Sequence, residues 1–223
     1  MNANGKHRIL VVDDHPIVRH GIVQLLNNQP DFECRLEADN ADAALEVLRE
    51  QSVDLAIVDI SLPGLSGLDL IRRMRSGNAA LPVLVLSMHE ESVYADRALA
   101  AGARGYVMKH EATEKLIDAA RKLLAGGLYL SRDVEERMFQ TYVGGASAGR
   151  TEMLSRLTQR EFEVLQMIAQ GITSTQIAAR INRSVKSVEG YRAAIRAKLG
   201  ARTTVDLARL ALEYFPANPR AHA

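Results

Sequence analysis

The chain has 223 residues, of which 47% are apolar and 25% charged, a balance typical of a folded globular protein. Its apolar runs are far shorter than the ~20 residues that span a membrane, and its single cysteine excludes an internal disulfide framework. Residues 1–150 carry a net charge of −4 and residues 151–223 a net charge of +5, which indicates two parts with different partners. We therefore expect a soluble, cytoplasmic protein of two domains with no membrane partner.

Apolar runs alternate with helical patterns along the first 125 residues. Continuously apolar runs are typical of strands covered on both faces of a parallel sheet, and the segments between them repeat apolar residues at helical spacing. The predicted strands are Arg8–Asp13, Glu33–Ala38, Leu55–Val58, Val83–Ser87 and Gly105–Lys109. The predicted helices are one from Pro16 through Ile17, Val18, Ile22, Leu25 and Leu26, then Ala41–Glu50, Leu68–Arg75, Val93–Ala101 and Thr113–Ala125. These elements predict an α/β domain with a doubly wound, five-stranded parallel sheet.

Charged and polar residues stand where the predicted strands end. Asp13 and Asp14 end the first strand, Asp59 the third, Ser87 the fourth and Lys109 the fifth. An aspartate after a strand is often only a helix cap, but all these positions share one edge of a parallel sheet. Clustered carboxylates repel one another unless a cation such as Mg²⁺ is bound. The set therefore suits phosphoryl transfer to an aspartate, with Mg²⁺ and the lysine neutralising the developing charge.

Residues beyond 125 leave the alternating pattern. Val143–Arg150 is rich in Gly, Ser and Ala and indicates a flexible linker. Capping boxes then begin at Thr158 and Thr173, each followed by apolar residues at helical spacing. After a turn at Asn182–Arg183, Ser184 caps a third helix that Gly200 ends, and Thr204–Tyr214 forms a fourth. We expect a small all-α domain of four helices.

The third helix of this domain has one apolar face and one face of small and basic residues. Val188, Ile195 and Leu199 fall together, while Lys186, Gly190, Ala193 and Ala197 fall opposite them. A glycine inside a helix costs about 1 kcal/mol relative to alanine, which close approach to a DNA edge would explain. Candidate phosphate contacts are Arg183, Lys186, Arg192, Arg196 and Lys198. The alternative is a packed four-helix unit with a solvated basic face.

The first part of the chain resembles the receiver domain of two-component response regulators, in the motifs VVDDHPIVRHGI, DISLPGLSGLDLI, VLVLSMH and AGARGYVMK. The resemblance implies a flavodoxin-like fold, with Asp59 as phosphoacceptor. It implies a Mg²⁺ site formed by Asp13, Asp14, Asp59 and the carbonyl of Ser61, and a switch pair of Ser87 and Tyr106, with Lys109 on the phosphoryl group. His110 follows that lysine, where many receivers have proline and the NarL/FixJ-type subgroup often has histidine.

The second part resembles the LuxR-type helix-turn-helix, in LTQREFEVLQMIAQG and IAARINRSVKSVEGYRAAIRAKLG. This resemblance implies double-stranded DNA as partner. The two resemblances together imply a NarL/FixJ-type response regulator, with a histidine kinase as phosphodonor and a receiver that masks the recognition helix until phosphorylation permits homodimerisation on DNA. Residues expected at DNA are Lys186, Ser187, Glu189, Gly190, Arg192, Ala193, Arg196 and Lys198. Glu189 can accept from cytosine N4 or only orient a neighbouring arginine. The expected domains are 6–125 (receiver), 126–153 (linker) and 154–217 (DNA binding).

Two other functions remain open at this point. Haloacid-dehalogenase-type phosphatases also use a strand-end aspartate and Mg²⁺, but they place a second aspartate two residues later, where this chain has Ser61. Without that acid/base group an acyl phosphate persists as a signal, so we expect a switch and not an enzyme. The other alternative is a regulator switched by a partner protein without phosphorylation.

Overall fold

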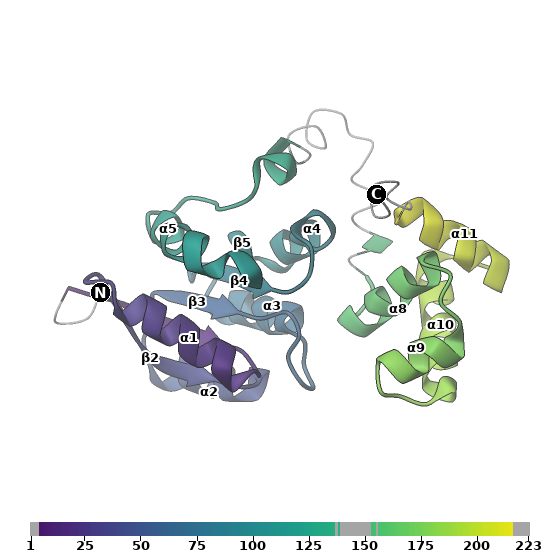
Figure 1. Ribbon diagram of the computed structural model, residues 1–223, viewed down its shortest axis with the longest axis horizontal. Helices are drawn as coiled ribbons and strands as arrows, with labels where there is room; N and C mark the ends of the chain where they lie inside the picture. The colour runs from purple at the N-terminus through teal and green to yellow at the C-terminus, as the bar shows by residue number, and fades with distance from the viewer. Residues whose placement is uncertain (1–4, 137, 139–152, 155, 216–223) are drawn as a thin grey trace. The chain divides into compact units, whose positions relative to one another are not determined.

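A computed structural model describes residues 5–136, 138, 153, 154 and 156–215 and divides the chain into two compact units at residue 143 (Figure 1). The first unit contains a sheet of five parallel strands in the order β2-β1-β3-β4-β5. The strands are β1 (His7–Val12), β2 (Phe32–Ala38), β3 (Leu55–Val58), β4 (Val83–Ser87) and β5 (Gly105–Met108). β3 is buried along its whole length, as expected for the central strand of a sheet covered on both faces. The predicted doubly wound sheet is confirmed.

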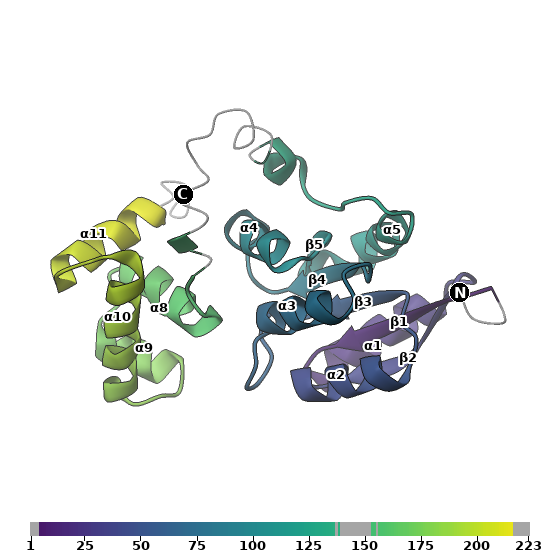
Figure 2. The ribbon, with the colours of Figure 1, turned by 180° about the vertical axis from the view of Figure 1, so that it is seen from behind.

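Helices cover both faces of this sheet (Figures 1 and 2). They are α1 (Pro16–Asn27), α2 (Ala41–Glu50), α3 (Gly67–Gly77), α4 (Glu91–Ala101) and α5 (Ala112–Leu124). The two views place α1 and α5 on one face of the sheet and α2, α3 and α4 on the other. Apolar residues of α1 and α5 form a core with Ile9, Val11 and Ile57. Each helix returns the chain to the start of the next strand, so all five strands end at one edge.

Two details differ from the sequence prediction. Ile17 was assigned to the apolar face of the first helix, but its side chain is 89% exposed, and Val23 occupies the core position instead. The prediction was wrong there because a helix of 3.6 residues per turn places Ile17 on the side away from the buried Ile22 and Leu26. Lys109 lies just beyond β5, in a 3₁₀ turn, η1 (Lys109–Glu111), that leads into α5.

Part of the predicted linker packs on the first unit. Tyr129 forms a parallel bridge with Gly105 of β5: its N–H donates to the carbonyl of Arg104 (3.0 Å), and its carbonyl accepts from the N–H of Tyr106 (2.9 Å). Leu130 and Val134 are buried. The chain therefore stays on the receiver-like unit for about ten residues after α5, while the Gly/Ser/Ala-rich stretch 143–150 lies outside the described residues.

The described part of the second unit contains α8 (Gln159–Ala169), α9 (Ser174–Arg180), α10 (Val185–Leu199) and α11 (Thr204–Tyr214). Both predicted capping boxes are present, Thr158 with Glu161 and Thr173 with Gln176. Ser184 caps α10, and Gly200 ends it with a left-handed φ of 71°. Val188, Ile195 and Leu199 are the buried residues of α10, as their spacing predicted. None of the helices in the described residues has the length and apolar character of a membrane span.

Candidate functional site

Two aspartates meet at the carboxyl edge of the sheet because β1 and β3 are neighbours. Val12 pairs with Val58, and the N–H of Asp59 donates to the carbonyl of Val12 (2.9 Å), which places Asp13 and Asp59 side by side. Both residues are almost fully buried, with exposed fractions of 1% and 2%. Two buried carboxylates in adjacent positions require compensating positive charge.

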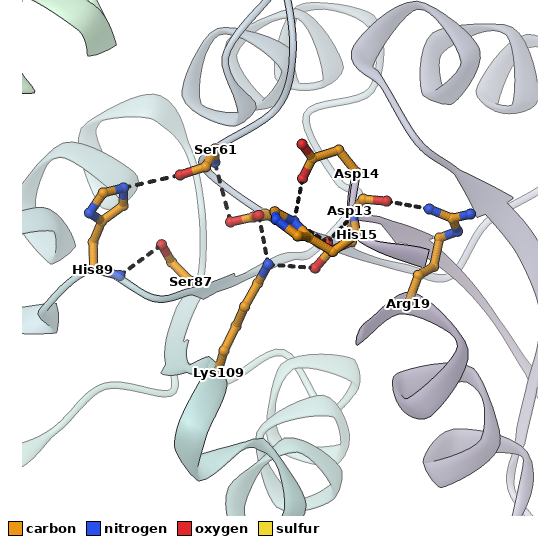
Figure 3. A network of polar contacts seen from close by, with 9 residues as sticks. Asp13, Asp14, His15, Arg19, Ser61, Ser87, His89 and Lys109 are labelled. Atoms are coloured by element: carbon orange, nitrogen blue, oxygen red, sulfur yellow. Dashed lines mark hydrogen bonds and ion pairs between the residues drawn. The ribbon is translucent and has the colours of Figure 1, made fainter. Parts of the chain in front are cut away.

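Lys109 supplies that charge from just beyond the end of β5, two strands away from β3 in the sheet. Its Nζ lies 2.7 Å from Asp13 Oδ2 and 2.7 Å from Asp59 Oδ2 (Figure 3). Burial by itself would lower the pKa of Lys109, but its bonds to the two carboxylates raise the pKa above its ordinary value, so the side chain is a cation. Burial raises the pKa of the Asp59 carboxyl, against the lowering effect of Lys109. A further cation at the site would strengthen the ionised form of Asp59.

The donor atoms around Asp13 and Asp59 fit a small, hard cation. One ligand atom each from Asp13, Asp14, His15 and Asp59 lies within 4.8 Å of the others. Asp13 Oδ2 and Asp14 Oδ1 are buried and accept no well-aligned hydrogen bond from the described residues. Lys109 Nζ forms an ion pair with Asp13 Oδ2 at 2.7 Å, and His15 Nδ1 lies 2.7 Å from Asp14 Oδ1. Buried carboxylate oxygens with free lone pairs are what Mg²⁺ takes from a protein. The carbonyl of Ser61 stays a predicted ligand.

Ser61, Ser87 and Tyr106 are linked to one another through His89. Ser61 N–H donates to Asp59 Oδ1 (3.2 Å), and its Oγ lies 3.1 Å from His89 Nε2 (Figure 3). The N–H of His89 donates to Ser87 Oγ (3.2 Å), and its carbonyl accepts from the Tyr106 hydroxyl (2.8 Å). Burial raises the pKa of the Tyr106 phenol well above its ordinary value, so it remains a donor. The residues expected to form the switch pair are therefore joined by the backbone of one loop.

The exposed face of α10 carries the small and charged residues that were expected there. Lys186, Glu189, Gly190 and Ala193 are exposed. A Cβ built on Gly190 would meet no atom within 4 Å, so nothing in the described residues occupies the space above it. Arg192 is mostly covered, and its Nε lies 3.9 Å from Oε1 of Glu189.

Two residues expected at DNA have partners within the second unit. Lys198 Nζ lies 2.6 Å from Oε2 of Glu161 in the capping box of α8. Ser187 sits in the first turn of α10, where its N–H donates to Ser184 Oγ (3.1 Å) and the two hydroxyls lie 2.9 Å apart. These contacts give Lys198 and Ser187 roles in holding α10 in place.

Comparison with known proteins adds independent information. The family model of the response regulator receiver domain matches residues 9–121, and that of bacterial regulatory proteins of the luxR family matches residues 155–211. The virulence-factor transcription regulator BvgA of Bordetella pertussis is 36% identical over 205 residues, covering 92% of this chain and 96% of BvgA. Transcriptional regulatory protein UhpA of Escherichia coli is 36% identical over 201 residues, covering 90% of this chain and 95% of UhpA.

Among solved structures, RcsB of Salmonella enterica serovar Typhimurium bound to promoter P1flhDC with the phosphomimetic BeF3⁻ aligns with a TM-score of 0.57 at 26% identity. The alignment covers 94% of this chain and 98% of that one. The chain belongs to the NarL/FixJ-type two-component response regulators. The predicted combination of a receiver domain with a LuxR-type helix-turn-helix domain is thereby confirmed.

Sequence reasoning missed several residues that shape this response regulator's acidic pocket. Arg19 donates to the carbonyl of Asp13 (2.6 Å), and its Nε pairs with Glu37 (3.1 Å), which ties the end of β1 to α1 and β2. His15 contacts Asp14. Gly67 begins α3 directly against the backbone of Asp59. Helical spacing counted from Pro16 and Ser66 could have placed Arg19 and Gly67 in the first turns of their helices. Spacing alone does not indicate which backbone atoms of other segments these two residues contact.

Proposed function

We propose that this response regulator accepts a phosphoryl group on Asp59 from a histidine kinase, and that phosphorylation controls its dimerisation and sequence-specific binding to duplex DNA. The observation that carries the proposal is the buried carboxylate of Asp59 with Lys109 Nζ 2.7 Å from Oδ2. A carboxylate held beside a buried cation is suited to attack phosphorus, because the cation neutralises charge as it develops.

The chemistry assigned to each residue follows from its place around Asp59. An oxygen of Asp59 attacks the phosphorus of a phosphohistidine, a P–O bond forms, and the P–N bond to the imidazole breaks. Lys109 then bonds the transferred group, and the Ser87 hydroxyl, which now accepts from His89, turns to it together with a rearrangement of Tyr106. Mg²⁺ held by Asp13, Asp14, Asp59 and the Ser61 carbonyl would supply further neutralisation of the phosphoryl oxygens.

The test of this assignment is the change Asp59→Asn in the full chain. An asparagine keeps the size of the side chain but removes the nucleophile, so incorporation of label from a small phosphodonor with Mg²⁺ should be abolished. Asp14→Asn is the matched control: it removes one carboxylate charge from the same pocket and should slow labelling without eliminating the acceptor. Undiminished label on the Asp59→Asn chain would show that another residue is the phosphoacceptor.

The second unit supports DNA as the partner. Its basic charge, the exposed strip of Lys186, Gly190 and Ala193 on α10, and the open space above Gly190 suit insertion of this helix in a major groove. RcsB has been solved as two dimers bound to two parallel DNAs and in complex with promoters, and we propose the same mode of action here. Among the expected contacts, Lys186, Arg192 and Arg196 would meet phosphates, while Glu189, Gly190 and Ala193 would face base edges.

Two alternatives are separable by experiment. A phosphatase is disfavoured because Ser61 occupies the place of the second aspartate, and its hydroxyl contacts His89 and not a carboxylate. We propose a switch and not an enzyme, so the acyl phosphate on the purified chain should decay slowly. A regulator switched by a partner protein alone would bind DNA equally well before and after labelling. The chain would act in the cytoplasm, where its DNA is.

The domain limits also form part of the proposal. We propose that the receiver begins at about residue 6 and that the DNA-binding domain spans 154–217. Because Tyr129, Leu130 and Val134 pack on the first unit, the functional linker would begin after residue 136 and not at 126.

A further inference from the structure

The segment that follows α5 adds a short extended piece to the free edge of the sheet. We name residues 128–134 the strap. β5 is one of the two edge strands of the sheet, and Tyr129 of the strap bonds the backbone on both sides of Gly105, at Arg104 and Tyr106. A Cβ on Gly105 would lie 3.0 Å from the carbonyl of Tyr129, so the strap lies close against the strand. Edge strands are commonly covered in this way.

The strap is held in place by more than these two bonds. Lys122 Nζ lies 5.7 Å from the centre of the Tyr129 ring, a cation–π contact. Leu130 is mostly buried and Val134 is 1% exposed. Gly126 takes a left-handed φ of 86° to turn the chain from α5 into the strap, a conformation that favours glycine. The strap is thus a built part of the receiver.

The strap also reaches α4. The N–H of Ser131 donates to Glu91 Oε1 (2.9 Å), across 40 residues of sequence. Ser131 in turn begins a helical turn, since its Oγ accepts from the N–H of Val134 (3.4 Å) and its carbonyl accepts from Glu135 (3.0 Å). Both ribbon views draw this turn beside α4 (Figures 1 and 2). Glu91 therefore fixes the point at which the chain leaves the receiver.

Both attachment points lie next to the residues expected to form the switch pair. Tyr106 contributes its backbone N–H to the strap and its hydroxyl to the carbonyl of His89. Glu91 begins α4, two residues after His89, whose N–H is bound to Ser87 Oγ. A movement of Ser87 and Tyr106 toward a phosphoryl group would break their bonds to His89, and a resulting shift of this loop or of the β5 backbone would move the anchors of the strap.

We propose that the strap is the output lever of the receiver. Its bonds to Tyr106 and Glu91 belong to the arrangement in which Asp59 is paired with Lys109, and phosphorylation weakens them, so that the chain leading to the second unit is released. This inference rests on the proposed function. The strap bonds favour the unphosphorylated state, in which the strap is attached. Their removal therefore shifts the equilibrium toward the state with a released strap, even without phosphorylation.

The test uses the full chain with Glu91→Ala, which removes the acceptor for Ser131. Glu91→Gln keeps an acceptor oxygen at the same place and should behave like the parent. Glu90→Ala is the matched control, because Glu90 is exposed and its side chain makes no capping bond to α4. Amide hydrogen exchange in residues 128–136 and affinity for duplex DNA are measured before and after treatment with a small phosphodonor, with label on Asp59 and the melting temperature recorded in each case.

In the parent chain, exchange in the strap should rise on phosphorylation. Glu91→Ala should raise strap exchange and DNA affinity before phosphorylation, the affinity by about tenfold, the scale of one hydrogen bond to a charged acceptor. Suppose that the parent chain takes label and binds DNA, while a folded Glu91→Ala chain keeps the parent's strap exchange and DNA affinity. That result would overturn the strap as a lever and leave the proposed function intact. A parent chain that takes no label would contradict the proposed function itself.

Discussion

Replacing Lys198 by methionine tests whether this lysine serves DNA binding or the packing of α10. Methionine keeps most of the aliphatic stem and removes only the ammonium group, which lies 2.6 Å from Glu161 Oε2. Glu161 also accepts from the N–H of Thr158 (2.7 Å) as part of the capping box of α8. In the variant the Glu161 side chain, which is only 7% exposed, keeps its capping bonds but loses the ammonium group of Lys198.

The size of the effect follows from the burial of the two partners. Removing one partner of a buried ion pair costs about 3–5 kcal/mol, and losing a hydrogen bond to a charged group costs about 1.5–3 kcal/mol. The Lys198 side chain is 34% exposed, so water can replace part of the ammonium, and we expect a loss of about 2 kcal/mol in the free energy of unfolding of the second unit. For a unit of 80 residues this corresponds to a fall in Tm of roughly 8–16 °C.

The same pair makes a prediction about pH. Burial alone would raise the pKa of Glu161, but its bonds to Lys198 and Thr158 outweigh burial and hold the pKa below its ordinary value of 4.5. A group with a lowered pKa in the folded state stabilises the fold above the ordinary pKa, and this contribution disappears as pH falls through the folded value. The difference in stability between the parent and Lys198→Met should be complete at pH 7 and should shrink below about pH 4.5.

Calorimetry of the full chain and salt titrations of DNA binding provide the measurement. Lys186→Met is the matched control, because Lys186 is exposed on the outer face of the same helix. That control should keep the parent's Tm and lower the slope of affinity against salt by about one unit. Lys198→Met should lower Tm and keep the slope. An unchanged Tm with a reduced slope in Lys198→Met would refute the packing role and restore the lysine as a phosphate contact.

Three further changes address the pocket and the DNA-facing helix. Asp14→Ala should weaken Mg²⁺ binding at least about tenfold in calorimetric titrations, as even outer-shell losses do; superimposable titrations would remove Asp14 from the site. Gly67→Ala would place a Cβ 1.9 Å from the carbonyl oxygen of Asp59. We therefore expect a loss of about 3 kcal/mol in the free energy of unfolding, measured with a chemical denaturant, together with impaired labelling. Gly77→Ala in the same helix is the control, because its Cβ meets no atom within 4 Å and should not destabilise the fold. Gly190→Leu should fold at least as well as the parent and lose affinity for the specific duplex far more than for a scrambled one; equal losses would refute groove entry by α10.

The sheet and its acidic edge could be predicted because each rests on a rule that needs no knowledge of tertiary contacts. Continuous apolar runs such as Leu55–Val58 identify strands covered on both faces. Once the strands are parallel, Asp13, Asp59 and Lys109 must arrive at one edge, and the structure places Lys109 against both aspartates. The capping boxes at Thr158 and Thr173 were likewise predictable because all their contacts are local.

Contacts between distant residues add possible roles that the sequence alone did not indicate. Lys198 was expected at DNA because it is basic and close to the exposed strip, yet its partner Glu161 lies 37 residues away in another helix. The strap could not be distinguished from a linker, since Glu91 and Ser131 are 40 residues apart and the bonds of Tyr129 are made by backbone atoms. Charge and composition describe what a segment can do in solvent, but they do not indicate which distant residues it contacts in the fold.

Gly67 and Gly190 show why one residue type supports opposite conclusions. Both stand in helices, where glycine is unfavourable by about 1 kcal/mol, so the sequence indicates in each case that something has excluded a side chain. At Gly67 the cause lies inside the protein, because the backbone of Asp59 occupies the place of a Cβ. At Gly190 no atom of the described residues within 4 Å of the Cβ position accounts for the glycine. Open space alone does not identify a partner, because Gly21 and Gly77 also stand in helices with no atom within 4 Å of the Cβ position. What distinguishes Gly190 is the exposed strip of small and basic residues around it, and this strip is where the backbone of α10 would approach duplex DNA.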